Sequence, residues 1–520
     1  MLAGPRYSLY RWLLARVTAK GFSDQDVHPL EVPTNDDIEV EPLAPEFPRL
    51  FRAKNYPATE HADGRVRDVA KRARLLPLVT RLPASSTRPI ADDHTGLLAD
   101  IYPARYRKIW ARAPVVPPEL EAADPLAALA VGGPFALYLQ RASTADDLES
   151  VAGGRIGPDD YVIDMRVLER YPTKPGLVAP GGLAVFTVDG DRLGTVGVLS
   201  GGRFHESSEP SFDRALRVLL CGLNEHLTTL VHNVTFHLGY VTPMAVATTN
   251  ELEPDHPIRR LIHPALQTTL IGNHELATFQ VVGAAGFSTR LFSHDYQTLV
   301  GMIDDHLERF RVADLDPEVA LVRQGLRGAP FELPLWDDAM ALWVINRRYV
   351  ERYVEHYYVD DVAVAADAQL AQWAETLDRL LPAGLYDDAG YLTAGEPLDR
   401  GTLARVCATF LHVSSATHDV VNNVVWDYST LNYAIPTVVP ESFENQDVRL
   451  SFDFLNTLIG TWKPFNMVLD GYSALALDDG AKRIMDDYVT NLKRRQATMG
   501  AEPGPPGRIF PAALNPSVSN

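Results

Sequence analysis

The stretch "HNVTFH" (residues 232–237) places two histidines five positions apart within a predicted helix. On an ideal α-helix this spacing rotates the two side chains about 140° from each other, so they would not share a face. A π-bulge, with about 4.4 residues per turn, brings the same pair within roughly 50°. Such bulges gather at functional sites, and a metal ion would account for the strain. The spacing therefore indicates either a bulged helix that carries two metal ligands or two unrelated core histidines.

A second pair of residues with metal-binding chemistry lies in "THDVVNN" (residues 417–423). His418 and Asn422 stand at i and i+4 of a predicted helix, which puts both side chains on one face. An imidazole nitrogen and an amide oxygen can share a metal, and such sets suit iron, manganese or zinc. A single helical histidine is more often a hydrogen-bonded core or surface residue. Two such pairs on separate helices give equal weight to two interpretations, a metal site in a bundle core and ordinary structural histidines.

The composition indicates a globular protein with a sizeable core. Of 520 residues, 46% are hydrophobic and 22% are charged, which is ordinary for a folded chain. The formal net charge of -19 argues against a nucleic-acid partner, because a phosphate-binding surface needs a basic excess. Two cysteines cannot form a disulfide framework and fit a reducing compartment. With no bilayer-spanning apolar run and no signal-peptide pattern, we expect a soluble cytoplasmic protein.

The pattern along the chain predicts a mainly α fold in one large unit over residues 1–520. Residues 1–211 are irregular with a small β portion, 212–499 show long helical periodicities, and the proline-rich 500–520 form an extended tail. Prolines also mark residues 112–125 as a connection rather than a regular element.

Two local patterns are specific enough to predict single elements. Residues 181–200 alternate β-forming residues around an Asp-Gly pair, which predicts a hairpin. Residues 366–382 predict an amphipathic helix with Leu370, Trp373 and Leu377 on its buried stripe.

Residues 6–20, "RYSLYRWLLARVTAK", place apolar side chains at helical spacing among basic ones. A helix of this kind can lie in a membrane interface, which would give the protein a peripheral membrane contact. The same stripe is typical of a first helix packed on the core, and we favour that interpretation.

Two further motifs do not indicate catalytic chemistry. "GAAG" (residues 283–286) lacks the lysine of a phosphate loop and does not follow a convincing strand. "IDDH" (residues 303–306) is typical of a solvated helix face rather than of a carboxylate dyad.

Several segments, taken in order, resemble the lipoxygenase family. "HNVTFH" is followed by "HPIRRLIHPALQTTL" (256–270), by "LPLWDDAMALWVINRRYVERYVEHYY" (333–358), by "SATHDVVNNVVWDY" (415–428) and by the ending "NPSVSN" (515–520). Each is similar to a signature of that family. The resemblance implies a lipoxygenase-like helical domain around a metal-binding bundle core, with a tail that returns to the metal. It also implies a compact bacterial-type member that lacks the N-terminal β-barrel domain of plant and animal relatives.

The resemblance implies a mononuclear non-heme iron site, and manganese accepts the same ligands. Carried over residue by residue, His232, His237 and His418 are the histidine ligands and Asn422 is a weaker fourth. The fifth family ligand is the terminal carboxylate, normally of isoleucine, which here belongs to Asn520. Because the carboxylate is part of the backbone, the ligand atoms survive the change of side chain.

The positions that link pocket to metal depart from the family pattern. The family has a glutamine four residues before the first ligand histidine and another three residues after the ligand asparagine. These positions are Thr228 and Val425 in this chain. Loss of both ends of one hydrogen-bonded network indicates replacement rather than random damage. Changes around the ligands alter metal affinity or activity by about 10–100-fold.

The positions that line the family's substrate pocket depart as well. The stereocontrol position, alanine or glycine in the family, aligns with Leu276, or with Ala277 if one residue is inserted. A leucine there would block the family's oxygen route. Val281 keeps the apolar character of the pocket, whereas the usually aliphatic position two residues after Gly286 is Ser288, which predicts a more polar cavity.

Three functional hypotheses follow from the resemblance. The leading one is a lipoxygenase-type dioxygenase that removes hydrogen from an unsaturated fatty acid and adds O2 to form a hydroperoxide. The second keeps the fold and metal for a different oxidation, such as an oxidase, desaturase or rearrangement reaction, of a more polar substrate. The third is a non-catalytic relative, against which the intact side-chain ligand positions argue.

Overall fold

The computed structural model describes fifteen stretches of the chain. They are residues 32–33, 37–57, 60, 87–88, 115–145, 148, 155–274, 278–386, 398–423, 427–429, 431, 434–442, 446–447, 471–500 and 507–518. The predicted amphipathic helix at residues 6–20 lies outside these described residues.

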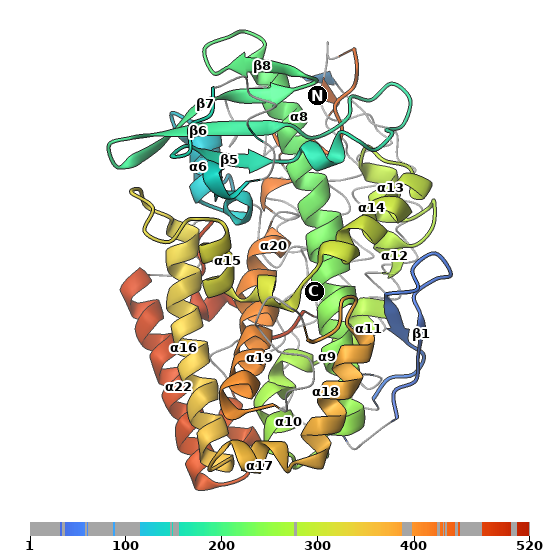
Figure 1. The fold of residues 1–520 in the computed structure, drawn as a ribbon, viewed down its shortest axis with the longest axis vertical. Helices are drawn as coiled ribbons and strands as arrows, with labels where there is room; N and C mark the ends of the chain where they lie inside the picture. Colours follow the sequence, from blue (N-terminus) through green and yellow to red (C-terminus); the bar gives the residue numbers. More distant parts are fainter. Residues whose placement is uncertain are drawn as a thin grey trace, which may run out of the picture.

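Long helices dominate the described part of the chain, and the mainly α prediction is confirmed (Figure 1). The α-helices are α6 (Pro125–Val131), α8 (Phe212–Glu225), α9 (Thr242–Glu251), α10 (Pro257–Ile262), α11 (Thr269–Gly272), α12 (Thr278–Val281), α13 (Phe287–Leu291), α14 (Tyr296–Arg309), α15 (Pro317–Arg323), α16 (Pro334–Tyr357), α17 (Asp361–Ala365), α18 (Ala368–Leu380), α19 (Arg400–His412), α20 (His418–Asn423) and α22 (Asp479–Met499). Two π-helical segments, η6 (His226–Val241) and η10 (Val413–Thr417), join α8 to α9 and α19 to α20.

Aspartate side chains begin most of the longer helices. A carboxylate at the N-cap accepts hydrogen bonds from backbone amides that have no partner within the helix, and it also complements the helix dipole. In α18 the Asp367 carboxylate accepts bonds from the amides of Gln369 and Leu370. Leu370, Trp373 and other apolar side chains of α18 are buried, as predicted for residues 366–382.

An antiparallel five-stranded sheet lies at one end of the helical core, beside the start of α8 (Figure 1). Its strands follow chain order: β4 (Gln140–Arg141), β5 (Tyr161–Asp164), β6 (Leu183–Asp189), β7 (Arg192–Ser200) and β8 (Arg203–Glu206). Strands β6 and β7 form the predicted hairpin, in which Asp189 pairs with Arg192. Its two-residue turn uses Gly190 at a φ of 64°, a left-handed conformation that glycine adopts without strain.

Short elements accompany this sheet. Strands β1 (Val40–Pro42) and β2 (Phe51–Ala53) pair with each other, as do β3 (Thr87–Arg88) and β9 (Gln446–Asp447). The prediction that residues 112–125 contain no regular element is wrong, because Pro118–Glu121 form a 3-10 helix. Proline at a first helical position has its backbone angle already set and loses no hydrogen bond there. The other 3-10 helices are Pro134–Tyr138, Ala142–Thr144, Arg166–Leu168, His263–Leu266, Val312–Leu315, Tyr472–Leu475 and Pro511–Ala513.

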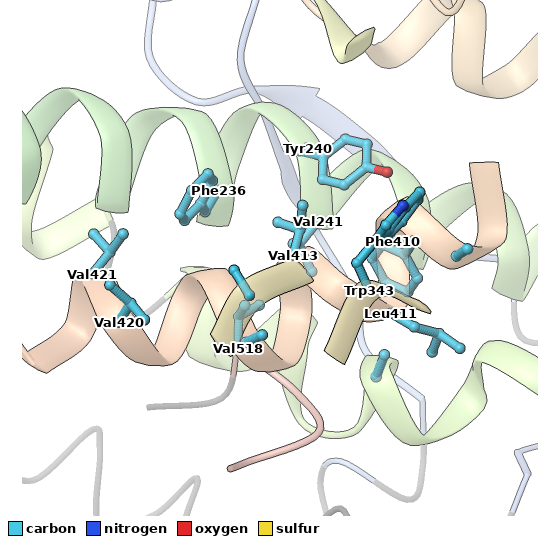
Figure 2. Close-up of a cluster of buried hydrophobic side chains, with 14 of the residues drawn as sticks. Phe236, Tyr240, Val241, Trp343, Phe410, Leu411, Val413, Val420, Val421 and Val518 are labelled. Carbon is cyan, nitrogen blue, oxygen red and sulfur yellow. The ribbon is translucent and has the colours of Figure 1, made fainter. Parts of the chain in front are cut away.

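The centre of the core lies between η6 and the segment from α19 to α20. Phe236 and Val241 of η6 belong to one buried apolar cluster with Val413 and Val421 (Figure 2). Val518 of the C-terminal tail packs in the same cluster and is fully buried. The described part of the tail therefore contributes to the interior rather than trailing over the surface.

The tail is held in place by one buried carboxylate. Asp338 of α16 accepts hydrogen bonds from the guanidinium groups of Arg495 and Arg508, at 2.6 and 2.5 Å, and from the backbone N–H of Ile509 at 3.1 Å. A fully buried carboxylate requires this number of partners. These contacts fix the direction in which the tail enters the core.

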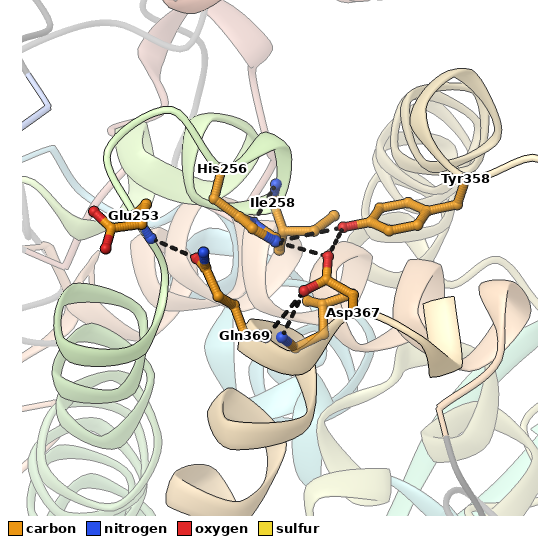
Figure 3. Close-up of polar contacts among 7 residues, drawn as sticks. Glu253, His256, Ile258, Tyr358, Asp367 and Gln369 are labelled. Atoms are coloured by element: carbon orange, nitrogen blue, oxygen red, sulfur yellow. Dashed lines mark hydrogen bonds and ion pairs between the residues drawn. The ribbon is translucent and has the colours of Figure 1, made fainter. Parts of the chain in front are cut away.

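A second polar junction ties three helix ends together (Figure 3). The imidazole of His256 accepts from the backbone N–H of Ile258 through Nδ1, so Nε2 carries the proton and donates to Asp367 Oδ2 at 3.1 Å. The hydroxyl of Tyr358 donates to the same oxygen at 2.8 Å. The start of α10, the end of α16 and the start of α18 thus share one carboxylate.

Within the described residues, no helix is both long and apolar enough to cross a membrane.

Candidate metal centre

Three buried histidines meet in the centre of the core. His232 and His237 come from η6, and His418 is the first residue of α20. Their three Nε2 atoms lie 3.1 Å from one another in each of the three pairs. Among the described residues, this is the one group of three or more histidine, cysteine or acidic side chains close enough to share a metal ion. We call it the metal cluster.

A π-helix is what allows η6 to supply two histidines to one point. With about 4.4 residues per turn, five residues complete a turn to within roughly 50°, so His232 and His237 share a face. The sequence suggested one widened turn, whereas the structure continues the π-helix for 16 residues. A second π-helical segment, η10, comes directly before His418.

The geometry fits a metal ion better than mutual hydrogen bonds. An Nε2–H lies in its ring plane and points at a single acceptor, so three equidistant nitrogens cannot satisfy one another. Two metal–nitrogen bonds of about 2.1 Å that are nearly perpendicular to each other would place their nitrogens about 3.0 Å apart. The observed 3.1 Å separations match that spacing.

Burial keeps the three imidazoles neutral, which is the form that binds metals. Desolvation lowers the pKa of His237 to about 4, although a hydrogen bond to Asn273 opposes the change. The pKa values of His232 and His418 lie well below the usual range, first through burial and then through the neighbouring histidines. At neutral pH each of the three imidazoles is therefore uncharged and has one nitrogen lone pair to offer a metal.

Asn273 orients one histidine of the cluster, and the sequence analysis did not identify it. His237 Nδ1 donates to Asn273 Oδ1 at 2.7 Å, which leaves Nε2 free of a proton. The Asn273 amide donates in turn to the carbonyl of His237 and to the hydroxyl of Thr242. A polar residue in the buried stretch "TLIGN" was the available signal. Among the described residues, Nδ1 of His232 and Nδ1 of His418 have no partner.

The structure describes one of the two remaining ligand positions that the resemblance implies. Asn422 lies one turn after His418 on α20, and its side chain is half-buried. Asn520 lies outside the described residues, although the chain reaches the core by Val518.

Thr228 takes part in a hydrogen-bonded link through Asn224, a residue that the sequence analysis did not identify. Its hydroxyl donates to Asn224 Oδ1 at 3.3 Å, and Ser429 donates to the same oxygen at 2.7 Å. The Asn224 amide also donates to the carbonyl of Pro436 at 3.3 Å. Asn224 therefore joins α8 to the segment that follows α20. Val425, the other position where the family has a glutamine, lies outside the described residues.

Two of the predicted pocket positions are described, and both are buried. Ser288 accepts a hydrogen bond of 3.0 Å from the hydroxyl of Thr229, so a polar pair stands where the family has an aliphatic residue. Val281 packs against Leu230 and Val234 of η6. Leu276 and Ala277 lie outside the described residues.

Comparison with known sequences finds similarity to lipoxygenases over part of the chain. Residues 224–456 match the family model described as Lipoxygenase. The chain is 25% identical over 216 residues to "Lipoxygenase 2, chloroplastic" of Tanacetum cinerariifolium, an alignment that covers 39% of this chain and 24% of the relative. It is 25% identical over 291 residues to "Linoleate 9S-lipoxygenase B" of Solanum lycopersicum, which covers 52% and 33%. The chain thus spans about a quarter to a third of the length of these relatives.

Comparison with solved structures identifies the fold. The coral 8R-lipoxygenase structure superimposes with a TM-score of 0.73 at 14% identity, covering 100% of this chain and 82% of that one. A lipoxygenase crystallised with arachidonate gives a TM-score of 0.71 at 13% identity, with coverage of 100% and 82%.

The fold is that of the helical catalytic domain of lipoxygenases, built around three converging histidines. Residues 224–456, which contain His232, His237 and His418, match the lipoxygenase family model, in agreement with the motif resemblance.

Proposed function

We propose that the protein is a non-heme iron dioxygenase of the lipoxygenase type. It would replace a C–H bond of an unsaturated fatty acid with C–O–O–H by adding O2. One observation carries the proposal: three neutral, buried Nε2 atoms lie 3.1 Å apart in a family fold.

His232, His237 and His418 would hold the metal, and Asn422 and the carboxylate of Asn520 would complete the set by resemblance. Bound there, iron would supply the one-electron chemistry that lets O2 react with carbon. Manganese is the second metal that suits this mixture of nitrogen and oxygen donors.

The chain's own residues would position the metal ligands and keep water out. Asn273 fixes the ring of His237 and selects the tautomer whose Nε2 lone pair faces the cluster. Phe236, Val420 and Val421, close in sequence to the histidines, are buried in one apolar cluster. A dry site protects a carbon radical from side reactions.

The names of relatives support the choice of substrate class. One relative is described as acting on linoleate, and one structural neighbour was crystallised with arachidonate. An unsaturated fatty acid and O2 are therefore the partners we propose for this chain.

A different oxidation of a more polar substrate is the alternative proposal. The buried Ser288 favours it, because its hydroxyl, which accepts a hydrogen bond from Thr229 of η6, stands at a position that is usually aliphatic in the family. In that case the metal cluster is retained and the reaction differs.

The decisive experiment combines metal analysis with a substrate assay on protein that has a native C-terminus. Iron content is measured by mass spectrometry, and conjugated-diene absorbance and O2 uptake are followed with linoleate and arachidonate. We expect about one iron per chain and matched diene formation and O2 consumption. An iron-loaded sample that yields neither signal would contradict dioxygenation and favour the alternative.

A further inference from the structure

A buried glutamate lies where three segments of the chain meet. Glu119 belongs to the 3-10 helix Pro118–Glu121 and is 9% exposed. Its Oε2 accepts a hydrogen bond of 3.2 Å from the hydroxyl of Tyr428, in the segment after α20. Its Oε1 lies against Gly507, where the described part of the tail begins. The carboxyl group therefore joins residues 115–121 to the tail and to the segment after α20.

The backbone around this carboxyl group is packed closely because it is glycine. A Cβ on Gly507, whose φ is 86°, would overlap Oε1 of Glu119. A Cβ on Gly132 would lie 2.8 Å from the same oxygen, and one on Gly133 would overlap the hydroxyl of Tyr428. This packing leaves little room for the water that an ionised carboxylate needs.

Glu119 lacks the compensation that another buried carboxylate of the core has. Asp338 binds two guanidinium groups. Within the described part of the chain, no basic side chain pairs with Glu119, and the titratable groups that face it are the hydroxyl of Tyr428 and the carboxylate of Asp427. Asp427 is itself 1% exposed, so two acids share a region with little water. Such a neighbour opposes ionisation.

The charged residues of the adjoining elements are engaged elsewhere. Asp124, at the start of α6, binds the backbone amide and hydroxyl of Thr195. In the tail, Arg508 donates to Asp338. Glu121, on the same 3-10 helix, is exposed. The described surroundings therefore provide no cation that would hold Glu119 in its ionised form.

The protonation state of Glu119 depends on whether this junction is closed. Burial raises the pKa of Glu119 to about 7, although hydrogen bonds from its own backbone and from Tyr428 oppose the change. In an open, hydrated junction the pKa returns to its usual 4.5. Between these two pH values only the closed junction binds the proton, so its stability falls as the pH rises from about 4.5 to about 7. Above that pH neither arrangement binds the proton and the difference stays constant.

We propose that Glu119 is a pH-sensitive latch, which is closed when its carboxyl group is protonated and released when that group ionises. In the closed state, residues 115–121 lie against Gly507 and Tyr428. Ionisation favours their separation from both segments, because water then reaches the carboxylate. The tail that begins at Gly507 leads to the buried Val518, so the latch covers the point where the tail enters the core. This device does not depend on the proposed reaction.

Amide hydrogen exchange measures the opening directly, because the backbone N–H of Val115 bonds to Asp427 Oδ1 across the junction at 3.2 Å. Exchange of peptides within residues 115–122 is followed by mass spectrometry on the full chain, and each rate is divided by the intrinsic exchange rate at that pH. From about pH 5.5 to about pH 7 we expect the opening equilibrium to rise about tenfold per pH unit, and then to stay constant up to about pH 8.5. An opening equilibrium that does not change over this range would overturn the proposal.

One variant with a matched control assigns the pH dependence to this carboxyl group. Glu119→Gln keeps a neutral group of the same shape, so we expect its opening equilibrium to be the same at every pH in the range. Glu121→Gln removes the same charge from an exposed position two residues away and is expected to keep the rise. If Glu119→Gln shows the same rise as Glu121→Gln, another group titrates and the proposal fails.

A second variant keeps Glu119 and tests its contact with Tyr428. Tyr428→Phe removes a hydrogen bond that favours the ionised carboxylate, so the pKa of Glu119 in the closed junction rises further. The pH at which the opening equilibrium becomes constant should therefore move upward relative to the unmodified protein. This measurement stands even if Glu119→Gln does not fold. An unchanged pH for that transition would contradict the closed arrangement of the latch.

Discussion

Two groups of histidines include residues of the π-helix η6, and they differ in what their ring nitrogens contact. In the metal cluster, Nε2 atoms of His232, His237 and His418 face one another with no protein donor between them. At the start of η6, His226 lies edge-on to His306 of α14, with ring centroids 5.5 Å apart. The three cluster histidines are buried and His226 and His306 are half-buried, yet burial lowers the pKa in both groups.

The second group is satisfied by hydroxyls. His226 Nδ1 bonds to the Tyr138 hydroxyl at 2.8 Å, and His306 Nε2 bonds to the Thr235 hydroxyl at 2.7 Å. Burial lowers the pKa of His226 to about 3 and that of His306 to about 4. A lowered pKa therefore does not identify a metal site. What distinguishes the candidate metal site is that three Nε2 atoms converge on one point with no hydroxyl or amide between them.

The largest effect is expected from removing one nitrogen of the metal cluster. His237→Ala or His418→Ala leaves two nitrogens, so we expect metal content to fall close to zero and activity to fall at least 100-fold. His226→Gln is the matched control on the same helix and should keep its metal. Full metal occupancy in His418→Ala, measured by mass spectrometry, would refute the ligand assignment.

The next largest effect is expected from the residue that orients His237. Asn273→Ala removes the acceptor of the Nδ1 proton, so the ring can change tautomer and rotate. Loss of such a contact typically weakens metal binding by about 10–100-fold. Competition with a chelator measures the affinity, and Asn273→Asp, which keeps an acceptor oxygen, should restore much of it. Equal metal affinity in Asn273→Ala and the unmodified protein would remove Asn273 from this role.

The sequence predicted the metal cluster because its signal is local. The five-residue spacing within η6 selected His232 and His237. The i, i+4 pair with Asn422, together with the family resemblance, selected His418. The hairpin of β6 and β7 and helix α18 were also predictable, since each depends on a periodicity within twenty residues.

Contacts between distant segments were not predictable from pattern. Asn273 is 36 positions from His237, and Tyr138 is 88 positions from His226, so only the tertiary fold brings them together. The length of η6 was also missed, because a π-helix has no sequence signature beyond the histidine spacing that a single bulge would satisfy. "IDDH" was interpreted as a solvated face, and Asp304 is exposed, yet His306 turns inward to Thr235.

Lowering the pH is expected to have an intermediate effect on the stability of the fold. Burial lowers the pKa of His412 to about 3, against about 6.5 in an unfolded chain. Below pH 6.5 the unfolded chain binds a proton that the folded chain does not, so stability falls as the pH drops from 6.5 toward 3. At pH 5 this one residue costs about 2 kcal/mol. Comparing metal-free protein with His412→Gln in urea unfolding at pH 7 and pH 5 should show a smaller loss in the variant.

The smallest effect is expected from the hydroxyl-paired group. Tyr138→Phe leaves His226 Nδ1 without its hydroxyl partner, which should lower the free energy of unfolding by about 1–3 kcal/mol. Metal content should not change, because neither Tyr138 nor His226 contributes a nitrogen to the metal cluster. Thermal unfolding and metal analysis on the same sample measure both quantities. If Tyr138→Phe loses its metal while remaining folded, the two groups of histidines are coupled, and the contrast between them would no longer hold.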